Sequence, residues 1–401
     1  MQLHFDTAIP LSLYIHMPWC VKKCPYCDFN SHEMKDPIDE ARYIDALIQD
    51  LTQELPAVWG RKLSSIFIGG GTPSLISAEG YEKLFSTMRS LIPFQPDMEI
   101  TLEANPGTFD ANNFAGYREL GINRLSIGVQ SFNNEQLQVL GRIHSSDQAL
   151  QAIEHAKRIG FDNFNIDLMH GLPDQTLLAA LADIKTAIQC EPTHISWYQL
   201  TLEPNTAFYN QPPTLPEEDI LIDIQDQGEA LLKSAGFDRY EISAFAKPGK
   251  ASFHNMNYWE FGDYLGIGAG AHQKLTNMQY QTVTRRHKFR HPKDYMNMSK
   301  GFVSGEKVLT AQELPLEFMM NAMRLMDGVP RALFAQRSGL MIENILPAIE
   351  KAQQKGLLEE SWQQLKPTPQ GYRFLNDLLE NFMTEQLQHH QSPKIIPIKP
   401  G

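Results

Sequence analysis

Cysteine is scarce in this chain of 401 residues, which holds only four. Three lie in one short segment and Cys190 stands alone, so no framework of disulfides of the kind that stabilises small secreted domains is expected. No apolar run approaches the roughly 20 residues of a membrane-spanning helix. The first residues, Met1–Asp6, lack the basic stretch and apolar core of a signal peptide. We therefore expect a cytoplasmic protein with at most peripheral membrane association.

Positive charge is also in short supply. The chain has 35 lysines and arginines against 47 aspartates and glutamates, a formal net charge of −12. This balance argues against a protein whose main task is to bind nucleic acid or another polyanion. The basic run Arg285–Arg290 is typical of a solvated loop or a strand edge. A hydrophobic content of 42% and a charged content of 20% are ordinary for a soluble globular protein.

The clustered cysteines are Cys20, Cys24 and Cys27. Thiolates at this spacing converge on one soft metal centre, because a short loop can point all of them inward. Three such ligands leave one iron of a four-iron cluster without a protein ligand, and a cosubstrate can chelate there. The alternative is a closed zinc site completed by a nearby histidine, His16 or His32.

Short β-rich runs alternate with helical patterns along the first half of the chain. The runs that predict strands are Leu11–Met17, Ser65–Ile68, Met98–Glu103, Arg124–Val129, Phe164–Met169 and His194–Leu200. The helical patterns between them are Asp39–Leu55, Ala78–Leu91, Asn133–Leu140, Ser146–Ile159 and Gln175–Ile188. About six such repeats imply a parallel sheet covered by helices, which right-handed crossovers curl into an incomplete barrel. The predicted fold class is α/β, with a partial (β/α)6 barrel of the TIM type.

Polar and glycine residues gather where these strands end. The second strand runs into Gly69–Gly71, the third ends at Glu103, the fourth at Gln130 and the fifth near Asp167. Any one of these alone is ordinary turn chemistry. Because the active sites of such barrels lie at the carboxyl ends of the strands, their repetition at one rim predicts a binding site there.

The second half of the chain predicts an extension of the barrel and a smaller module. The segments expected to add strands and loops are Asp238–Phe245, His254–Trp259 and Tyr264–His272. Further on, helical patterns precede a two-stranded wing, formed by Gly356–Leu358 and Leu365–Thr368, and a helix over Pro369–Glu385. The predicted division is a barrel core at 1–210, an extension at 211–305, a small helical, winged-helix-like domain at 306–385 and a disordered tail at 386–401.

Several motifs together resemble one family. The Cys-x-x-x-Cys-x-x-Cys loop is similar to the signature of the radical S-adenosylmethionine (SAM) superfamily, in which three cysteines hold a [4Fe–4S] cluster and SAM chelates the fourth iron. The other motifs are YIHMPWC from Tyr14, GGGTPS from Gly69, EANP from Glu103, GVQSF from Gly128, GRIH from Gly141 and GLPDQT from Gly171. Over about residues 11–272 they resemble the oxygen-independent coproporphyrinogen III oxidases and their relatives.

The resemblance implies which residues hold the cofactors. The three clustered cysteines would ligate the [4Fe–4S] cluster. The positions that match SAM contacts of the family are Tyr14, Tyr26, Gly70, Gly71, Thr72, Glu103, Gln130, Arg142 and Asp167. Arginine suits a bidentate pair with the SAM carboxylate, and glycine lets the backbone approach a ligand closely.

Two departures from the oxidase pattern matter. Phe29 stands two positions after the third cluster cysteine, where the oxidase has a further cysteine. The segment HNMNYW, from His254 to Trp259, resembles a signature of the heme chaperone branch of the family. Imidazole is a common axial ligand of heme iron, and aromatic rings suit a porphyrin face. The resemblance thus implies heme binding at His254. His272, at the end of the glycine-rich segment from Tyr264, is a second candidate ligand, and in a porphyrin-binding protein the basic run would meet the propionates.

The hypothesis from the sequence is a radical SAM-type heme chaperone. The resemblance implies respiratory cytochrome subunits and bacterioferritin as acceptors of the heme, and a homodimer when the cluster is bound. One alternative is an enzyme that decarboxylates coproporphyrinogen III by radical SAM chemistry. The other is a zinc-stabilised nucleic-acid binder that uses the winged-helix-like end, although acidic residues on the last predicted helix favour a packing role there.

Overall fold

A mixed sheet forms the centre of the molecule. The computed structural model describes residues 2–297, 299 and 301–383. Within them the 12-stranded sheet has the order β14-β13-β12-β11-β1-β4-β5-β6-β7-β8-β10-β9. The parallel strands are β1 (Leu11–Met17), β4 (Leu63–Gly70), β5 (Phe94–Ala104), β6 (Arg124–Gln130), β7 (Phe164–His170), β8 (His194–Gln199) and β11 (Asp263–Ile267). The edge strands β14 and β9 do not pair with each other, so the α/β sheet is an incomplete barrel, as predicted.

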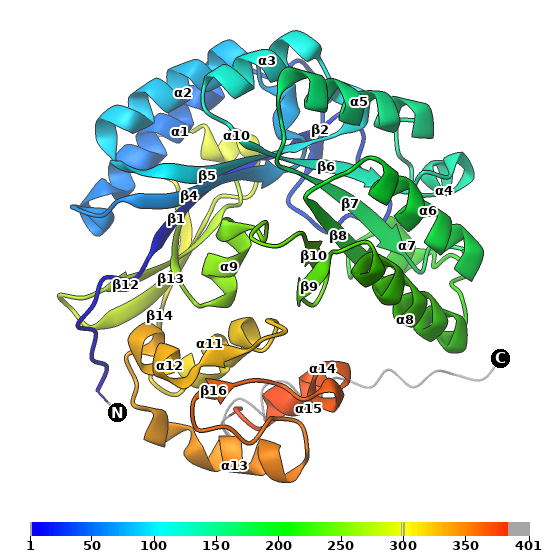
Figure 1. Ribbon diagram of the computed structural model, residues 1–401. Helices are drawn as coiled ribbons and strands as arrows, with labels where there is room; N and C mark the ends of the chain where they lie inside the picture. Colours follow the sequence, from blue (N-terminus) through cyan, green and yellow to red (C-terminus); the bar gives the residue numbers. More distant parts are fainter. Residues whose placement is uncertain (1, 298, 300, 384–401) are drawn as a thin grey trace.

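Helices cover one face of this sheet (Figure 1). They are α1 (Glu40–Glu54), α2 (Ala78–Leu91), α3 (Ala111–Glu119), α5 (Ser146–Ile159), α6 (Leu177–Gln189) and α8 (Glu218–Ser234). Helix α5 shows why such segments fold locally. Ser145 and Gln148 form a capping box at its start, and Gly160 ends it with φ 98°. Cys190 caps the carboxyl end of α6.

Side chains alternate along the parallel strands between the two faces of the sheet. In β7, Ile166 and Leu168 belong to the hydrophobic core. Asn165 and Asp167 take the opposite face and are hydrogen-bonded to each other at 2.8 Å. Tyr14 of β1 likewise lies opposite its apolar neighbours and lines a cavity. The concave face of the sheet therefore carries polar side chains although it is largely buried.

Antiparallel strands extend the sheet at both edges. β10 (Ala244–Ala246) and β9 (Asp238–Glu241) follow β8, while β12 (His272–Asn277), β13 (Thr282–Lys288) and β14 (Val303–Leu309) follow β11. Lys288 at the end of β13 is fully buried and pairs with Asp50 and Glu54 of α1, each at 2.6 Å. This ionic cluster attaches the extension to the barrel.

The expectation of strands or loops at His254–Trp259 was wrong, because this segment lies in helix α9 (Phe253–Trp259). The Ser252 side chain caps the helix, and the Glu99 carboxylate accepts from the first backbone N–H groups. Such acceptors at a helix N-terminus stabilise the helical conformation of a segment rich in aromatic residues. α9 lies between the sheet and the C-terminal helices (Figure 1).

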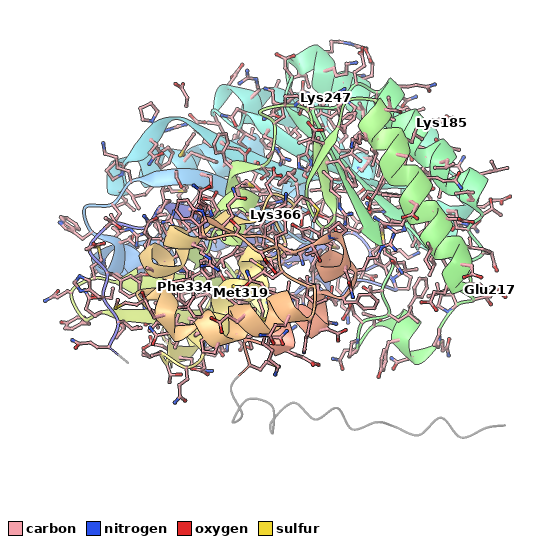
Figure 2. All side chains as sticks on the ribbon, turned by 60° about the horizontal axis from the view of Figure 1, so that its bottom comes forward. Lys185, Glu217, Lys247, Met319, Phe334 and Lys366 are labelled. Carbon is pink, nitrogen blue, oxygen red and sulfur yellow. The ribbon has the colours of Figure 1, made fainter. Side chains whose placement is uncertain are left out.

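The C-terminal elements surround a second hydrophobic core. They are α11 (Leu314–Ala322), β15 (Val329–Pro330), α12 (Arg331–Ser338), α13 (Leu346–Gln354), β16 (Gln364–Leu365), α14 (Pro369–Arg373) and α15 (Leu375–Glu380). Met319 of α11 and Phe334 of α12 are fully buried there (Figure 2). Phe5 and Ile9 join the same core, so the first residues of the described chain pack against the last elements.

The predicted wing has a counterpart in the structure. Leu358 and Pro367 form an antiparallel bridge, and β16 also pairs with β15. The helix predicted over Pro369–Glu385 is interrupted at Phe374, with φ −115° and ψ 49°, which separates α14 from α15. The predicted tail at 386–401 lies outside the described residues. Among the described residues, no helix combines the length and the apolar character needed to cross a bilayer.

Candidate functional site

The cysteine loop closes against the end of β1. Cys20 lies in β2 (Trp19–Cys20), which pairs with β3 (His32–Glu33), and the Met34 N–H donates to the Cys20 carbonyl at 2.9 Å. Cys20, Cys24 and Cys27 all line one cavity of about 350 Å³. The spacing therefore brings the three thiols to one space, as the sequence predicts.

The donors in this cavity suit a cluster better than a single ion. Within the described residues, no group of three or more histidines, cysteines, aspartates or glutamates is arranged to hold one metal ion. A zinc ion would need its thiolates about 2.3 Å from one point, whereas each cysteine of a [4Fe–4S] cluster binds its own iron. Both ring nitrogens of His16 have partners, the Tyr14 hydroxyl and the Asn30 carbonyl, each at 2.9 Å. His16 is therefore not placed as a zinc ligand, and the three-thiol set fits the cluster.

The glycine turn after β4 brings backbone against the cysteine loop. The Gly71 N–H donates to the Met17 carbonyl at 2.7 Å. A Cβ at Gly71 would lie 2.4 Å from the Trp19 carbonyl oxygen, and one at Gly70, with φ 117°, would lie 2.5 Å from the His16 ring. Only glycine fits at these two positions, so the turn can present its backbone to a ligand in the cavity.

Two carboxyl groups form the opposite wall of the cavity. Glu103 accepts from the Gly70 N–H at 2.9 Å, and Asp167 accepts from Ser126 at 3.0 Å and Asn165 at 2.8 Å. Burial, with the neighbouring charge of Asp167, raises the pKa of Glu103 to about 8. Burial also raises the pKa of Asp167. Two buried acids at one site favour a positively charged or proton-donating ligand between them.

A guanidinium group lies on the cysteine side of the same cavity. Arg142 donates to the Cys24 sulfur at 3.6 Å and to the Gly128 carbonyl at 2.6 Å, and its Nε is buried without a partner within the described chain. The predicted SAM contacts that line this cavity are Tyr26, Gly70, Gly71, Thr72, Glu103, Gln130, Arg142 and Asp167. Tyr14 does not line it but faces an adjoining space.

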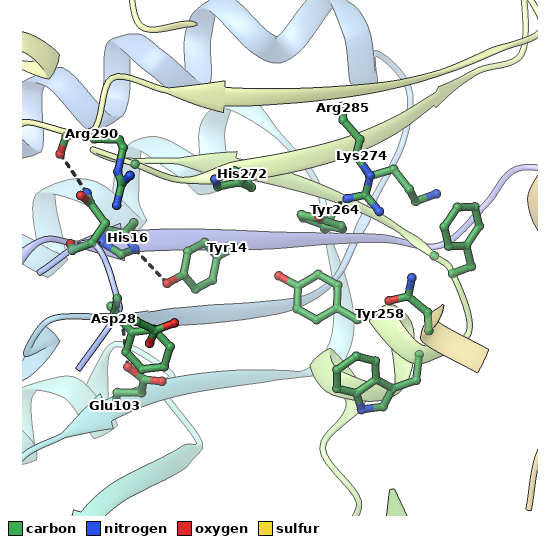
Figure 3. Close-up of a pocket in the computed structure, with 18 residues that line it drawn as sticks. Tyr14, His16, Asp28, Glu103, Tyr258, Tyr264, His272, Lys274, Arg285 and Arg290 are labelled. Atoms are coloured by element: carbon green, nitrogen blue, oxygen red, sulfur yellow. Dashed lines mark hydrogen bonds between the residues drawn. The ribbon is translucent and has the colours of Figure 1, made fainter. Parts of the chain in front are cut away.

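That adjoining space is a second cavity of about 580 Å³ (Figure 3). Its aromatic lining consists of Tyr14, Phe29, Tyr258, Trp259, Phe261 and Tyr264. Its basic side chains are His16, His272, Lys274, Arg285 and Arg290. Asp28, Phe29, Gly70 and Glu103 line both cavities, so the two spaces meet beside the glycine turn. Its volume is typical of a site for a small molecule or cofactor.

His254, the predicted heme ligand, lies outside both linings. It is 1% exposed, and its ring nitrogens are hydrogen-bonded to Ser65 at 3.0 Å and to the Tyr258 hydroxyl at 2.9 Å. Burial lowers the pKa of His254 to about 3, so the ring is neutral. In this arrangement neither ring nitrogen is free to bind iron, and the assignment of His254 as a heme ligand stays a prediction.

Sequence reasoning missed several residues of the second cavity. Asp28 and Asn30 follow the cysteine loop, Tyr264 lies in β11 and Lys274 in β12, so these residues come from three separate segments, and none was singled out as a binding residue. One signal was present: His272 and Lys274 alternate along a strand, as Arg285 and His287 do along the next. Alternate residues share a face of a sheet, so this pattern marks a basic face.

Comparisons with known proteins agree with this architecture. The family model described as the Radical SAM superfamily matches residues 14–184, and the HemN C-terminal domain matches residues 309–374. The heme chaperone HemW of Escherichia coli is 48% identical over 376 residues, which cover 94% of this chain and 99% of that protein. HemW of Haemophilus influenzae is 50% identical over 381 residues with the same coverage. HemW of Bacillus subtilis is 35% identical over 384 residues, 93% of this chain and 99% of that protein.

A solved structure shows the same fold. Coproporphyrinogen III oxidase (HemN) from Escherichia coli, described as a radical SAM enzyme, matches with a TM-score of 0.79 at 24% identity, over 94% of this chain and 91% of that chain. At this identity the likeness concerns the fold. The similarity to the HemW proteins is much closer and nearly full-length, and from it we conclude that the chain belongs to the HemW family of radical SAM proteins.

Proposed function

We propose that this protein is a heme chaperone that binds a [4Fe–4S] cluster, SAM and heme and delivers the heme to haemoproteins. The observation that carries the proposal is the pair of adjoining cavities, one with three thiols and two buried acids and the other with aromatic and basic walls. The names of the nearly full-length relatives support the same function.

The first cavity would hold the cluster and SAM. Cys20, Cys24 and Cys27 would ligate three irons, and the cluster would supply an open iron and one-electron chemistry. Arg142 would pair with the SAM carboxylate through its planar fork. The backbone of the glycine turn would contact the amino group, since no Cβ stands in the way there.

The two acids would complement the positive sulfonium group of SAM. Below about pH 8 Glu103 keeps its proton in the protein without ligands. A cation placed beside it favours the ionised carboxylate, so the proton would leave as the ligand binds. Asp167 is fixed by Ser126 and Asn165 and would orient a hydroxyl or amino donor rather than move.

The second cavity would hold the heme. Heme is a flat, largely apolar ring with two anionic propionates, and the cavity combines aromatic side chains with basic ones. Phe29, which is 63% exposed and takes the place of the oxidase cysteine, lies where the two cavities meet. An apolar ring at this junction suits the storage of heme better than further metal or thiol chemistry.

The finer assignments follow from this proposal. Respiratory cytochrome subunits and bacterioferritin would be acceptors, and the protein would act in the cytoplasm, with membrane contact only through an acceptor. A homodimer would form when the cluster is bound. The net charge of −12 supports a protein partner rather than nucleic acid.

A parallel incubation tests the proposal. Anaerobically reconstituted protein is mixed with hemin in one series, and with coproporphyrinogen III, SAM and a one-electron reductant in the other. We expect a saturable Soret band with hemin and no protoporphyrinogen IX. Conversion of coproporphyrinogen III would show that the protein is an oxidase instead.

A cysteine variant tests the cluster. The Cys24→Ala variant should lose the broad iron–sulfur absorbance, whereas Cys190→Ala, which changes a thiol at the end of α6, should keep it. Equal iron and sulfide contents in the two variants would contradict the assignment of the cysteine loop as the cluster site.

A further inference from the structure

One histidine ring that lines the second cavity makes no hydrogen bond to the described part of the chain. The lining includes two histidines, His16 and His272. Both ring nitrogens of His16 are hydrogen-bonded. So are both ring nitrogens of His254, which is buried and does not line the cavity. Within residues 2–297, 299 and 301–383, neither ring nitrogen of His272 has a hydrogen-bond partner, and the side chain is exposed.

We propose that His272, rather than His254, supplies the axial ligand to the heme iron, with Arg290 binding a propionate; this inference rests on the proposed heme-chaperone function. His272 begins β12, and it lies on the same side of Tyr14 as Arg290 in the view of Figure 3. Both side chains line the second cavity.

The strand register explains why His272 faces the cavity. Lys274 is two residues further along β12 and also lines the cavity, so the two share one face of the sheet. The Cα partners across to β13 are His287 for His272 and Arg285 for Lys274. Side chains of paired residues stand on the same side of the sheet. The basic face thus turns toward the aromatic residues of β1 and α9.

His272 is in the right protonation state to bind a metal. Partial desolvation of the ring, which lies against β13, acts with the nearby His287 to lower the pKa of His272, so its ring is neutral at neutral pH. The His272 and His287 rings stack with centroids 5.5 Å apart and an interplanar angle of 26°. A neutral imidazole can give its lone pair to iron without first losing a proton.

Arg290 is the cation of this wall that remains available for an anion. Lys274 is paired with Asp263 at 2.9 Å, and Arg285 is paired with Glu317. Arg290 has no ion pair among the described residues, and its side chain is exposed. The Gly270 N–H donates to the Phe289 carbonyl at 2.9 Å, which fixes the Arg290 segment beside the start of β12.

The binding step needs no electron donor. A ring nitrogen of His272 gives its lone pair to ferric heme iron, and a weakly held water or chloride leaves that iron. The iron stays ferric and no proton is transferred. The propionate and the guanidinium pair as ions, with the fork of Arg290 meeting the two carboxylate oxygens.

Hemin titration of the full-length protein tests the assignment by absorption and electron paramagnetic resonance spectra. The His272→Ala variant should lose the spectrum of the imidazole-ligated heme and bind hemin about tenfold more weakly. Free imidazole should restore the spectrum, which a purely structural effect would not allow. The His272→Met variant should bind heme with the changed spectrum of a thioether ligand, which keeps the test independent of a folding defect.

The controls are the nearby histidines. His287→Ala removes the stacked neighbour that does not line the cavity, and His254→Ala removes the buried ring; both should keep the wild-type spectrum. Loss of the spectrum in His254→Ala with rescue by imidazole, or an unchanged His272→Ala variant, would overturn the inference while heme binding stands. A wild-type protein without a saturable Soret band would instead overturn the proposed function.

The Arg290→Ala variant should weaken hemin binding without moving the Soret band, and a shifted band would contradict the role of Arg290 at the propionate.

Discussion

Replacing Glu103 by glutamine tests the electrostatics of the cysteine cavity without any bound ligand. In the folded chain the pKa of Glu103 is raised from 4.5 to about 8 by burial and by Asp167. The folded protein therefore holds a proton that the unfolded chain has already lost. The contribution of this bound proton to the free energy of unfolding is complete below pH 4.5 and is lost as the pH rises to about 8. A shift of this size corresponds to on the order of 5 kcal/mol.

The Glu103→Gln variant removes this dependence but keeps the local contact. The amide oxygen can still accept the Gly70 N–H, which donates to Glu103 at 2.9 Å in the wild-type protein. The free energy of unfolding of the variant should thus fall less between pH 5 and pH 8 than that of the wild type. By pH 8 the variant should be the more stable protein by a few kcal/mol.

Urea unfolding of the cluster-free protein, followed by circular dichroism at several pH values, measures this difference. The Glu154→Gln variant, which changes an exposed carboxylate on α5, is the matched control and should follow the wild-type curve. If the Glu103→Gln and wild-type curves ran parallel from pH 5 to pH 8, Glu103 would be ionised in the folded protein, and our description of the cavity would be wrong.

Three further changes have defined outcomes. Arg142→Ala should weaken SAM binding by about ten- to a hundredfold in equilibrium dialysis, because SAM loses a charged hydrogen-bonding partner. The iron content should stay unchanged, and loss of the iron would show that Arg142 has a structural role. Gly71→Ala should abolish SAM binding, because the new Cβ would meet the Trp19 carbonyl at 2.4 Å, and unchanged affinity would refute the glycine-turn contact. Lys288→Met should lower the free energy of unfolding by about 3–5 kcal/mol, since it leaves Asp50 without its partner; an unchanged urea midpoint would show that this pair is dispensable.

The fold could be predicted because local patterns and tertiary structure agree in the barrel. Strand β1 spans Leu11–Met17 in the structure, which is the range that the sequence predicts. The alternation of polar and apolar residues along β7 is what a strand with one cavity-lining face requires. The segment Phe253–Trp259 misled the prediction, because aromatic residues favour strands and the Glu99 contact that starts the helix is distant in sequence.

 The Glu99 carboxylate lies 154 positions before Phe253, so no local pattern in the sequence could reveal that contact.

The candidate site was predictable in part for the same reason. Glu103 and Gln130 lie at the carboxyl ends of β5 and β6, and Asp167 lies three residues before the end of β7. Because parallel strands end at one rim, the convergence of these side chains on the cysteine loop follows from the strand order. The second cavity was not predictable as a unit, because it combines β1, α9 and the β12–β13 pair. The two bonds that occupy His254 were also hidden, since Ser65 lies 189 positions away in the sequence.

Heme delivery is the property that defines a chaperone, and a transfer experiment measures it directly. The heme-loaded protein is mixed anaerobically with apo-bacterioferritin, the two are separated, and the Soret absorbance of each fraction is recorded over time. We predict that heme moves to the acceptor faster than it moves to apomyoglobin, a scavenger with no specific surface for this protein. Equal rates for the two acceptors would mean that heme is simply released into solution, and this result would contradict the proposed function.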